Sequence, residues 1–158
     1  MRIHRSKSFW AILVCMALLE ESYMRWANQV ERFAVRNSGA VAVTEGAGDH
    51  CCEYMTGGKI VILGSIGRNI GAGMTGGVAF VFDEKNDVEK KVNREIVSIY
   101  EISTPKQEQI LLEIINDYHH KTQSPKAANL LKDWSNFKTF FKVIVPPSEQ
   151  EMLGLKNQ

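Results

Sequence analysis

The sequence has little net charge and no long apolar run, and each shortage argues against a class of protein. Its 158 residues carry a formal net charge of only +1, whereas a dedicated nucleic-acid binder usually presents a strongly basic stripe. The apolar run at residues 9–19 is too short to span a membrane. Neither nucleic acid nor a membrane is therefore expected as a partner.

Cysteine is also scarce, since the chain holds only Cys15, Cys51 and Cys52. Two adjacent cysteines do not bridge each other easily, and no C-x-x-C spacing of the kind that binds metal is present. Free Cys is among the most buried residue types. We predict buried free thiols, a reducing compartment and no metal site.

The first 25 residues differ in character from the rest. Arg2, Arg5 and Lys7 precede the apolar run, as in a signal peptide, but no small-x-small cleavage site follows. We interpret residues 1–25 as an unmatched leader, either an ordinary amphipathic stretch or the product of an incorrect gene model. Secretion is not expected.

What the sequence does have is a repeat of 19 residues. Gly39, Gly58 and Gly77 are 19 residues apart, as are Gly48 and Gly67. The run Met-Thr-Gly-Gly at residues 55–58 returns at residues 74–77, and each of the first three glycines precedes a short apolar run. A fixed period of this length is typical of a solenoid, in which each repeat stacks on the last.

The composition of the repeat predicts a β-helix over residues 26–102, with coils of 19 residues. Each repeat offers short runs of β-forming residues separated by glycines, and none of its segments has helical periodicity. Glycine is suited to tight corners because it tolerates positive φ. We assign the structural turns to these glycines: Gly39, Gly48, Gly58, Gly67 and Gly77.

Stacking at this period predicts which side chains form columns. Val41, Ile60 and Ala79 would form one inner column, and Val43, Ile62 and Val81 another. The alternate positions contain Lys59 and would face outward. Val61 and Phe80 on that face would need a cover.

Residues 103–158 predict a helical tail packed on the repeats. Thr104, Pro105 and Gln107 are typical of a helix start, with an apolar stripe that continues to about Lys121, and Ser124-Pro125 starts a second helix. These helices would cover the outward apolar face. Part of residues 92–100 predicts a last strand, and residues 143–145 form a further apolar segment.

The glycine-rich run at residues 64–73 is a candidate phosphate cradle. It includes Gly71-x-Gly73, but no helix pattern and no Gly-Lys-Ser/Thr follows, so the helix dipole that would hold a phosphate is missing. These glycines also recur with the repeat. We predict a structural role for them.

No other set of residues predicts an active site. Asp49, His50 and Cys51 are adjacent, and neighbours on a strand point to opposite faces. Asp49 and Arg68 are 19 residues apart, which predicts an ion pair between neighbouring repeats. His119-His120 lies at a predicted helix end without metal-binding partners.

Three stretches resemble the C-terminal domain of the large subunit of glutamate synthase. They are residues 31–40, 45–58 and 67–77, and the likeness continues through Asp133-Trp134 and residues 141–143. The resemblance covers about residues 26–145. It implies a right-handed single-stranded β-helix followed by a small helical tail.

The resemblance also implies a function for the parent enzyme, which makes two glutamates from glutamine, 2-oxoglutarate and a reductant. That enzyme uses a cysteine glutaminase, FMN and an iron–sulfur cluster, in other domains. Cys15, Cys51 and Cys52 do not match the cluster ligands, so we predict no catalytic, cofactor-binding or metal-binding residue here. The expected partners are the glutaminase and FMN domains, in the cytoplasm or, for a plant or alga, the plastid.

A second interpretation stays open. The chain would be a freestanding interaction module of the same glycine-repeat fold, resembling the domain shared with a formylmethanofuran dehydrogenase subunit. It would then bind a partner other than the glutamate synthase domains.

Overall fold

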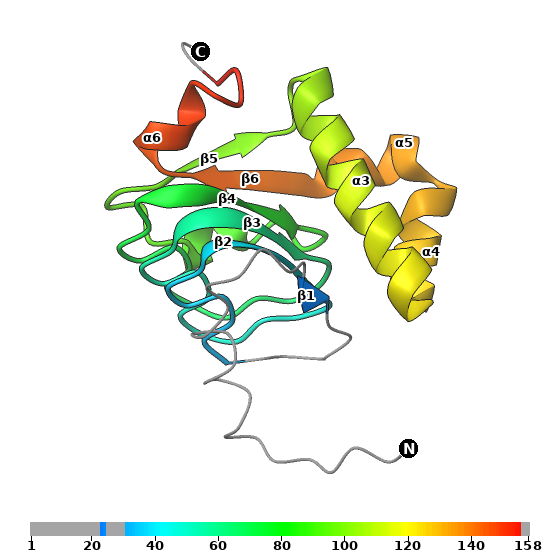
Figure 1. Cartoon of the computed structure of the whole chain (residues 1–158), viewed down its shortest axis with the longest axis horizontal. Helices are drawn as coiled ribbons and strands as arrows, with labels where there is room; N and C mark the ends of the chain where they lie inside the picture. The colour runs from blue at the N-terminus through cyan, green and yellow to red at the C-terminus, as the bar shows by residue number, and fades with distance from the viewer. Residues whose placement is uncertain (1–22, 25–30, 156–158) are drawn as a thin grey trace.

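The computed structural model describes residues 23–24 and 31–155 (Figure 1). The predicted leader lies outside these residues apart from 23–24, and Cys15 lies outside them altogether. The strands are β1 (Tyr23–Met24), β2 (Ser38–Thr44), β3 (Thr56–Ile62), β4 (Gly76–Phe82), β5 (Ser98–Glu101) and β6 (Phe141–Val145). The helices are α2 (Val88–Lys91), α3 (Pro105–Thr122), α4 (Pro125–Lys132), α5 (Trp134–Phe137), the 3₁₀ helix η1 (Lys138–Phe140) and α6 (Pro147–Gln150).

The predicted single-stranded β-helix is wrong: the strands form one mixed sheet in the order β1-β2-β3-β4-β6-β5. β1 to β4 pair in parallel, and each 19-residue repeat contributes one of the strands β2, β3 and β4. Beyond the last repeat the sheet continues with β6 and β5. β6 runs antiparallel to both of its neighbours, β4 and β5. The predicted helical tail is therefore also incomplete, because residues 141–145 are a strand inside the sheet.

Backbone conformation explains why each repeat contributes only one of the named strands. Between those strands the chain forms turns in which alternate residues have positive φ, a conformation outside the β region. Three such residues occur in each repeat, at 18 or 19 residue intervals: Arg32, Ala34 and Arg36; His50, Cys52 and Tyr54; Asn69, Gly71 and Gly73. These turns still bond to one another, since the His50 amide donates to the Arg68 carbonyl and the Tyr54 amide to the Ala72 carbonyl.

The predicted columns are half right. Ile60 pairs with Ala79, and Ile62 with Val81, but on β2 their partners are Ala42 and Thr44. An irregularity between Ser38 and Val41 shifts the β2–β3 register from 19 residues to 18. A shift of one residue moves side chains to the other face, so Val41 and Val43 lie on the outer face and their predicted place in the inner columns is wrong.

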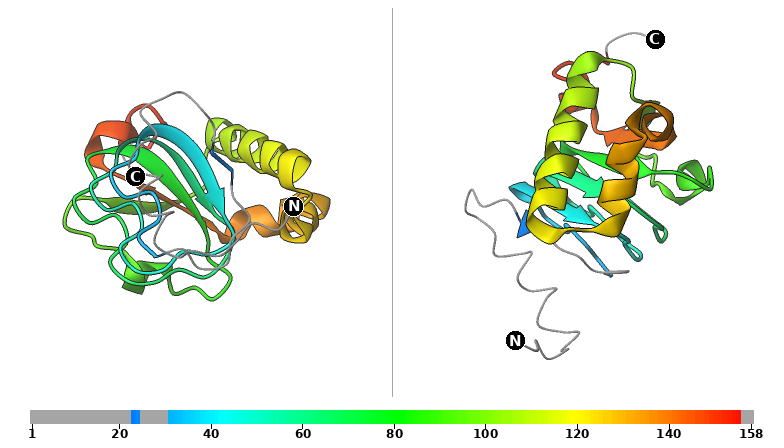
Figure 2. Two further views of the ribbon diagram at one scale, coloured as in Figure 1. Left: turned by 60° about the horizontal axis from the view of Figure 1, so that its bottom comes forward. Right: turned by 90° about the vertical axis from the view of Figure 1, so that its right-hand side faces the viewer.

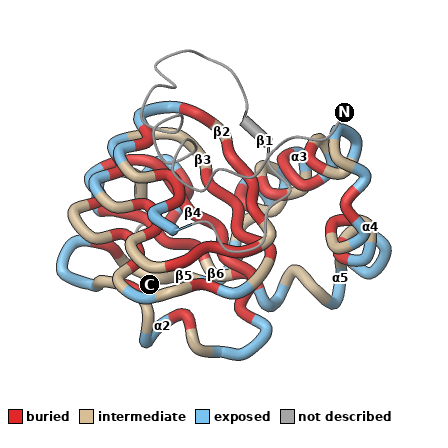
Figure 3. The backbone as a smooth tube through the Cα atoms, turned by 90° about the horizontal axis from the view of Figure 1, so that it is seen from below, coloured by how far each residue is buried: buried red, intermediate tan, exposed pale blue. Residues whose placement is uncertain are grey.

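The sheet separates two cores of buried side chains, and Figure 3 shows that buried residues run along the strands. The inner core lies between the sheet and the turns and contains Ile60, Ile62, Ala79, Val81, Met55, Met74, Cys51 and Cys52. The outer core lies on the opposite face and contains Val43, Val61, Phe80, Val143, Leu111, Ile115 and Tyr118. Both are apolar clusters, and burial of apolar surface is the main driving force for folding.

Helices α3 and α4 cover the outer face side by side (Figure 2). Val61 and Phe80 pack beneath them, which confirms that these two residues need a cover. The Thr104 hydroxyl accepts a hydrogen bond from the Gln107 amide, with Pro105 in the first turn, and Ser124 caps α4 in the same way. These predicted helix starts are confirmed. None of the helices in the described ranges is long and apolar enough to cross a membrane.

Candidate functional site: a groove over the glycine row

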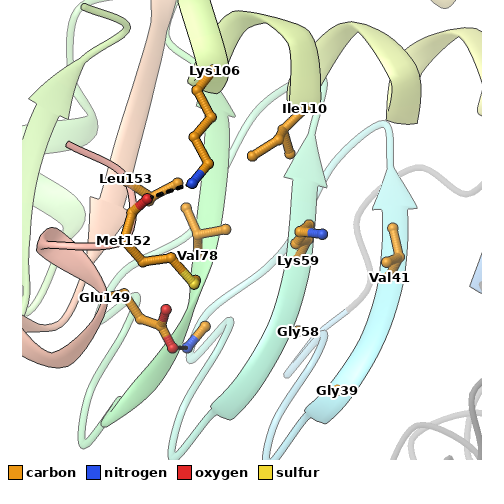
Figure 4. A pocket seen from close by; sticks show the side chains of 11 residues that line it. Gly39, Val41, Gly58, Lys59, Val78, Lys106, Ile110, Glu149, Met152 and Leu153 are labelled. Carbon is orange, nitrogen blue, oxygen red and sulfur yellow. Dashed lines mark hydrogen bonds between the residues drawn. The ribbon is translucent and has the colours of Figure 1, made fainter. Parts of the chain in front are cut away.

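A groove of about 400 Å³ lies on the helix-covered face, where α3 leaves the starts of the strands open (Figure 4). Gly39, Gly58 and Gly77 line its floor, one from each of the parallel strands β2, β3 and β4. We call these three residues the glycine row. Its walls come from the start of α3 and from the C-terminal segment: Lys106, Ile110, Glu149, Met152 and Leu153.

The backbone at the glycine row favours glycine at two of its three positions. Gly58 has φ of +92° and Gly77 has φ of +82°, which L side chains rarely adopt. A Cβ on Gly58 would also collide with the Ala40 carbonyl and the Asn37 side chain. At Gly39 a Cβ would meet open space, so the row is crowded at β3 and β4 and open at β2.

The C-terminal segment binds one end of the glycine row. The Gly77 amide donates a hydrogen bond of 3.1 Å to Glu149 Oε1, and the Ser148 hydroxyl donates one of 2.7 Å to the Thr75 carbonyl. Lys106 Nζ closes the groove above by donating to the Met152 carbonyl at 2.9 Å. Gly77 is consequently buried, whereas Gly58 is half-buried and Gly39 exposed.

Lys59 is the unusual residue of the groove. It occupies one row of the sheet with Val41 and Val78, on the face that otherwise carries the outer core. Its side chain is half-buried, and within the described ranges its ammonium group has no ion-pair partner. A charge placed beside apolar side chains loses part of its hydration, which costs free energy unless an opposite charge compensates.

The predicted turns at Gly39, Gly58 and Gly77 are wrong, because these glycines lie within strands β2, β3 and β4. Gly48 and Gly67 lie between strands and pack against neighbouring repeats. A Cβ on Gly48 would collide with the Glu31 carboxylate, and one on Gly67 with the backbone of Asp49. In the candidate phosphate cradle, the Gly67 amide donates to the Ala47 carbonyl and the Gly71 amide to the Cys51 carbonyl. Those two amides hold the repeats together and do not point at a ligand.

The structure does not bring Asp49, His50 and Cys51 together as a reactive group. Asp49 binds Arg68, with 2.7 Å from the Arg68 amide to Oδ1 and 3.4 Å from Nη2 to Oδ2. This confirms the predicted ion pair. His50 Nδ1 lies 3.0 Å from the Asn69 side-chain amide.

The two described thiols are free and fully buried, as predicted. Cys51 Sγ lies 3.6 Å from Cys52 Sγ. This hydrogen bond and the complete burial raise the pKa of Cys51 well above its ordinary value, so the thiol stays protonated and unreactive at neutral pH. Across the described ranges no cluster of three or more His, Cys, Asp or Glu side chains could hold a metal ion.

A second hollow, of about 320 Å³, lies at the opposite ends of the same strands. Asp83 lines it, and Asp83 Oδ1 accepts hydrogen bonds from the amides of Asp87 and Val88 at the start of α2. Asp83 Oδ2 is buried and has no hydrogen-bond partner among the described residues. This carboxylate therefore fixes a turn, and sequence analysis did not single it out.

The fold describes a glycine-repeat domain with an open groove on one face, and comparison with known proteins gives its family. The sequence model of the GXGXG motif family matches residues 21–147. The chain therefore belongs to the GXGXG motif family, and its curated relatives named below are glutamate synthases.

Over 121 residues, 77% of this chain, the sequence is 54% identical to the chloroplastic ferredoxin-dependent glutamate synthase of Spinacia oleracea. It is 53% identical over the same length to ferredoxin-dependent glutamate synthase 2 of Synechocystis. A third relative, the NADH glutamate synthase of Schizosaccharomyces pombe, is 47% identical over 123 residues. The chain spans about 8% of the length of the first two proteins and 6% of the third.

Proposed function

We propose that this chain serves as the C-terminal structural domain of a glutamate synthase and contributes no catalytic residue of its own. The parent reaction converts glutamine, 2-oxoglutarate and a reductant to two glutamates. The observation that carries the proposal is the identity of 54% with the spinach ferredoxin-dependent enzyme over 121 residues. Its partners would be the glutaminase and FMN domains of that enzyme, and FMN and the iron–sulfur cluster would be held there.

Two features of the structure support a structural role. The amides of the candidate phosphate cradle are engaged between repeats, and the Cys51 thiol is buried with a raised pKa. Polar groups that are satisfied inside a fold stabilise it and are not available for chemistry. The location would be the chloroplast in a plant or alga and the cytoplasm elsewhere.

A domain exchange tests the proposal. The 121 matched residues of the spinach enzyme would be replaced by those of this chain, and glutamate formation measured with glutamine, 2-oxoglutarate and reduced ferredoxin. We expect the chimera to be active and the enzyme without the segment to be inactive. As a matched pair, the chimera with Ile60→Asp should lose activity and the chimera with Ile96→Asp should keep it, because Ile60 is fully buried and Ile96 is 41% exposed.

Two results would overturn the proposal. One is a chimera that binds FMN with a normal flavin spectrum but forms no glutamate. The other is deamination of glutamine by this chain alone, because that reaction would require a catalytic residue within it.

A freestanding interaction module is the second candidate, and the open groove over the glycine row favours it. An antibody raised against residues 36–83 would separate the two in an extract of the source cells. A band far above 17.8 kDa would support the glutamate synthase domain, and a band near 17.8 kDa would support the separate module.

A further inference from the structure

We propose that the groove over the glycine row binds a short segment of a partner protein that carries a carboxylate followed by apolar side chains. Like the proposed function, on which it rests, this requires a polypeptide partner. The groove is the contact surface, and a carboxylate with apolar side chains is what it would bind. Three observations support it: a repeated binding motif, a lysine that no described acid pairs with, and an apolar wall.

The first observation is that the chain already shows how one copy of the motif binds such a segment. Met-Thr-Gly-Gly at residues 74–77 accepts a hydrogen bond from Ser148 through the Thr75 carbonyl and donates one to Glu149 through the Gly77 amide. The same four residues stand at 55–58 on the neighbouring strand, and Gly58 shares the positive φ of Gly77. The equivalent surface at Gly58 lies beside the one at Gly77 (Figure 4), but Gly58 is half-buried whereas Gly77 is buried.

The second observation is the charge of the groove. Its lining contains Lys59, Lys106 and one acid, Glu149, and Glu149 is already engaged by Gly77. Lys59 directly follows Gly58 and, within the described ranges, has no ion-pair partner. A carboxylate at this position would complement the lysine, and such complementarity selects partners and fixes their register.

The third observation is the apolar wall beside Lys59. Val41 and Ile110 are partly buried, and Met152 is 58% exposed. A cavity of about 400 Å³ is within the usual range of binding pockets. An apolar side chain that follows the carboxylate in the partner would cover these residues. At the other end of the row Leu153, which follows Glu149 in the chain, packs in the outer core in this way.

The test uses the full chain and a defined probe, the nonapeptide with the sequence of residues 147–155. This peptide is the segment that already lies against Gly77, and residue 149 supplies its carboxylate. Binding would be followed by fluorescence anisotropy of the labelled peptide and by backbone amide NMR of the protein. We expect the largest shifts at Gly39, Gly58 and Lys59, and weaker binding at high salt.

Matched variants distinguish a specific contribution of the Lys59 charge from non-specific binding of the peptide. Lys59→Gln should weaken binding about fivefold, as expected for one partly buried ion pair, whereas Lys132→Gln on the exposed side of α4 should not change it. A peptide with Gln in place of its first Glu should bind the native protein as weakly as the native peptide binds Lys59→Gln. Lys132→Gln should keep the native thermal midpoint because its side chain is exposed, and Lys59→Gln should not lower it, because the change removes a partly dehydrated charge.

The proposal would be overturned by equal binding of Lys59→Gln and Lys132→Gln, or by amide shifts at Gly77 alone, which would mean exchange with the chain's own segment. A dimer in analytical ultracentrifugation that Lys59→Glu dissociates would assign the groove to a second copy of this chain instead. The domain exchange and the peptide experiment fail independently, because the first measures glutamate formation and the second measures occupation of the groove.

Discussion

Asp49 and Arg68 are 19 residues apart in the sequence and lie on adjacent repeats, with 2.7 Å between Asp49 Oδ1 and the backbone amide of Arg68. The guanidinium contact between the same two residues is longer, at 3.4 Å, and the Arg68 side chain is largely exposed. The backbone hydrogen bond is therefore the stronger link, and the salt bridge is secondary.

This geometry predicts the titration of Asp49. The hydrogen bond from the Arg68 amide, followed by the Arg68 side chain, lowers the pKa of Asp49 below its ordinary 3.8. Because Arg68→Ala keeps the backbone amide, the pKa should remain below 3.8 in that variant, as measured by carboxyl NMR. A return to the ordinary value would show that the guanidinium is the main cause.

The same shift predicts how Asp49 contributes to stability as pH changes. A carboxyl group with a lower pKa in the folded state stabilises the fold above its unfolded pKa, and this contribution is lost as pH falls through the folded pKa. Asp49→Asn should therefore reduce the difference in stability between pH 6 and pH 3. Chemical denaturation at the two pH values would measure it.

Tyr118 provides a test of how the helices are held on the sheet. Its ring is fully buried in the outer core, and its hydroxyl donates a hydrogen bond of 3.2 Å to Glu45 Oε1 at the end of β2. Burial and the neighbouring Glu45 raise the pKa of Tyr118 above its ordinary value. Ser124, which caps α4, also binds Glu45, so this one carboxylate joins β2 to both helices.

Tyr118→Phe should lower the free energy of unfolding by about 1.5 kcal/mol, because it removes one hydrogen bond to a charged group. Tyr54→Phe is the matched control, since Tyr54 is 55% exposed, and it should change stability by less than about 0.5 kcal/mol. Urea denaturation would measure both. Equal effects of the two changes would mean that the Glu45 contact contributes nothing.

Parts of this fold follow from the sequence because they depend on local signals. Thr104-Pro105 and Ser124-Pro125 start helices where their capping chemistry predicts. The 19-residue spacing correctly joins Asp49 to Arg68 and brings residues 40–44, 59–62 and 78–81 into neighbouring strands. Each of these needs only a few adjacent residues or one fixed period.

The register of β2 could not be predicted in the same way. Residues 40–43 are all apolar, so both faces of the strand are apolar and alternation carries no information about which face is which. The shift at Ser38–Val41 depends on backbone pairing, which alignment of the glycines does not show. Likewise β6 pairs with β4 and β5 across long stretches of chain, a contact without a local signal.

The groove was also missed, although one sign of it was present in the sequence. Lys59 interrupts a row in which its neighbours are Val41 and Val78, and it follows the first of two identical Met-Thr-Gly-Gly runs. That the second run binds Ser148 and Glu149 depends on how the C-terminal segment packs. Sequence spacing alone does not determine that packing.

A charge in the inner core tests the assignment of faces. Ile60 is fully buried between Ala42 and Ala79, so Ile60→Asp should unfold the protein at 25 °C, as followed by circular dichroism. Removing a carboxylate from water without a partner costs several kcal/mol, comparable to the whole stability of a domain. Ile96→Asp, at a position that is 41% exposed, should remain folded, and a folded Ile60→Asp protein would contradict the inner core described here.

The alternating positive φ of the turns predicts that two buried alanines differ in their tolerance of glycine. Ala34 has φ of 58°, which strains an L residue by about 1 kcal/mol, whereas Ala42 lies in β2. Glycine relieves the strain at residue 34 but adds conformational freedom to the unfolded chain, worth about 0.5–1 kcal/mol. Both changes remove a buried methyl group, so Ala34→Gly should destabilise by about 1 kcal/mol less than Ala42→Gly, which has no strain to relieve. Parallel urea denaturation of the two variants measures the difference, and equal destabilisation by both would mean that residue 34 does not adopt the left-handed conformation.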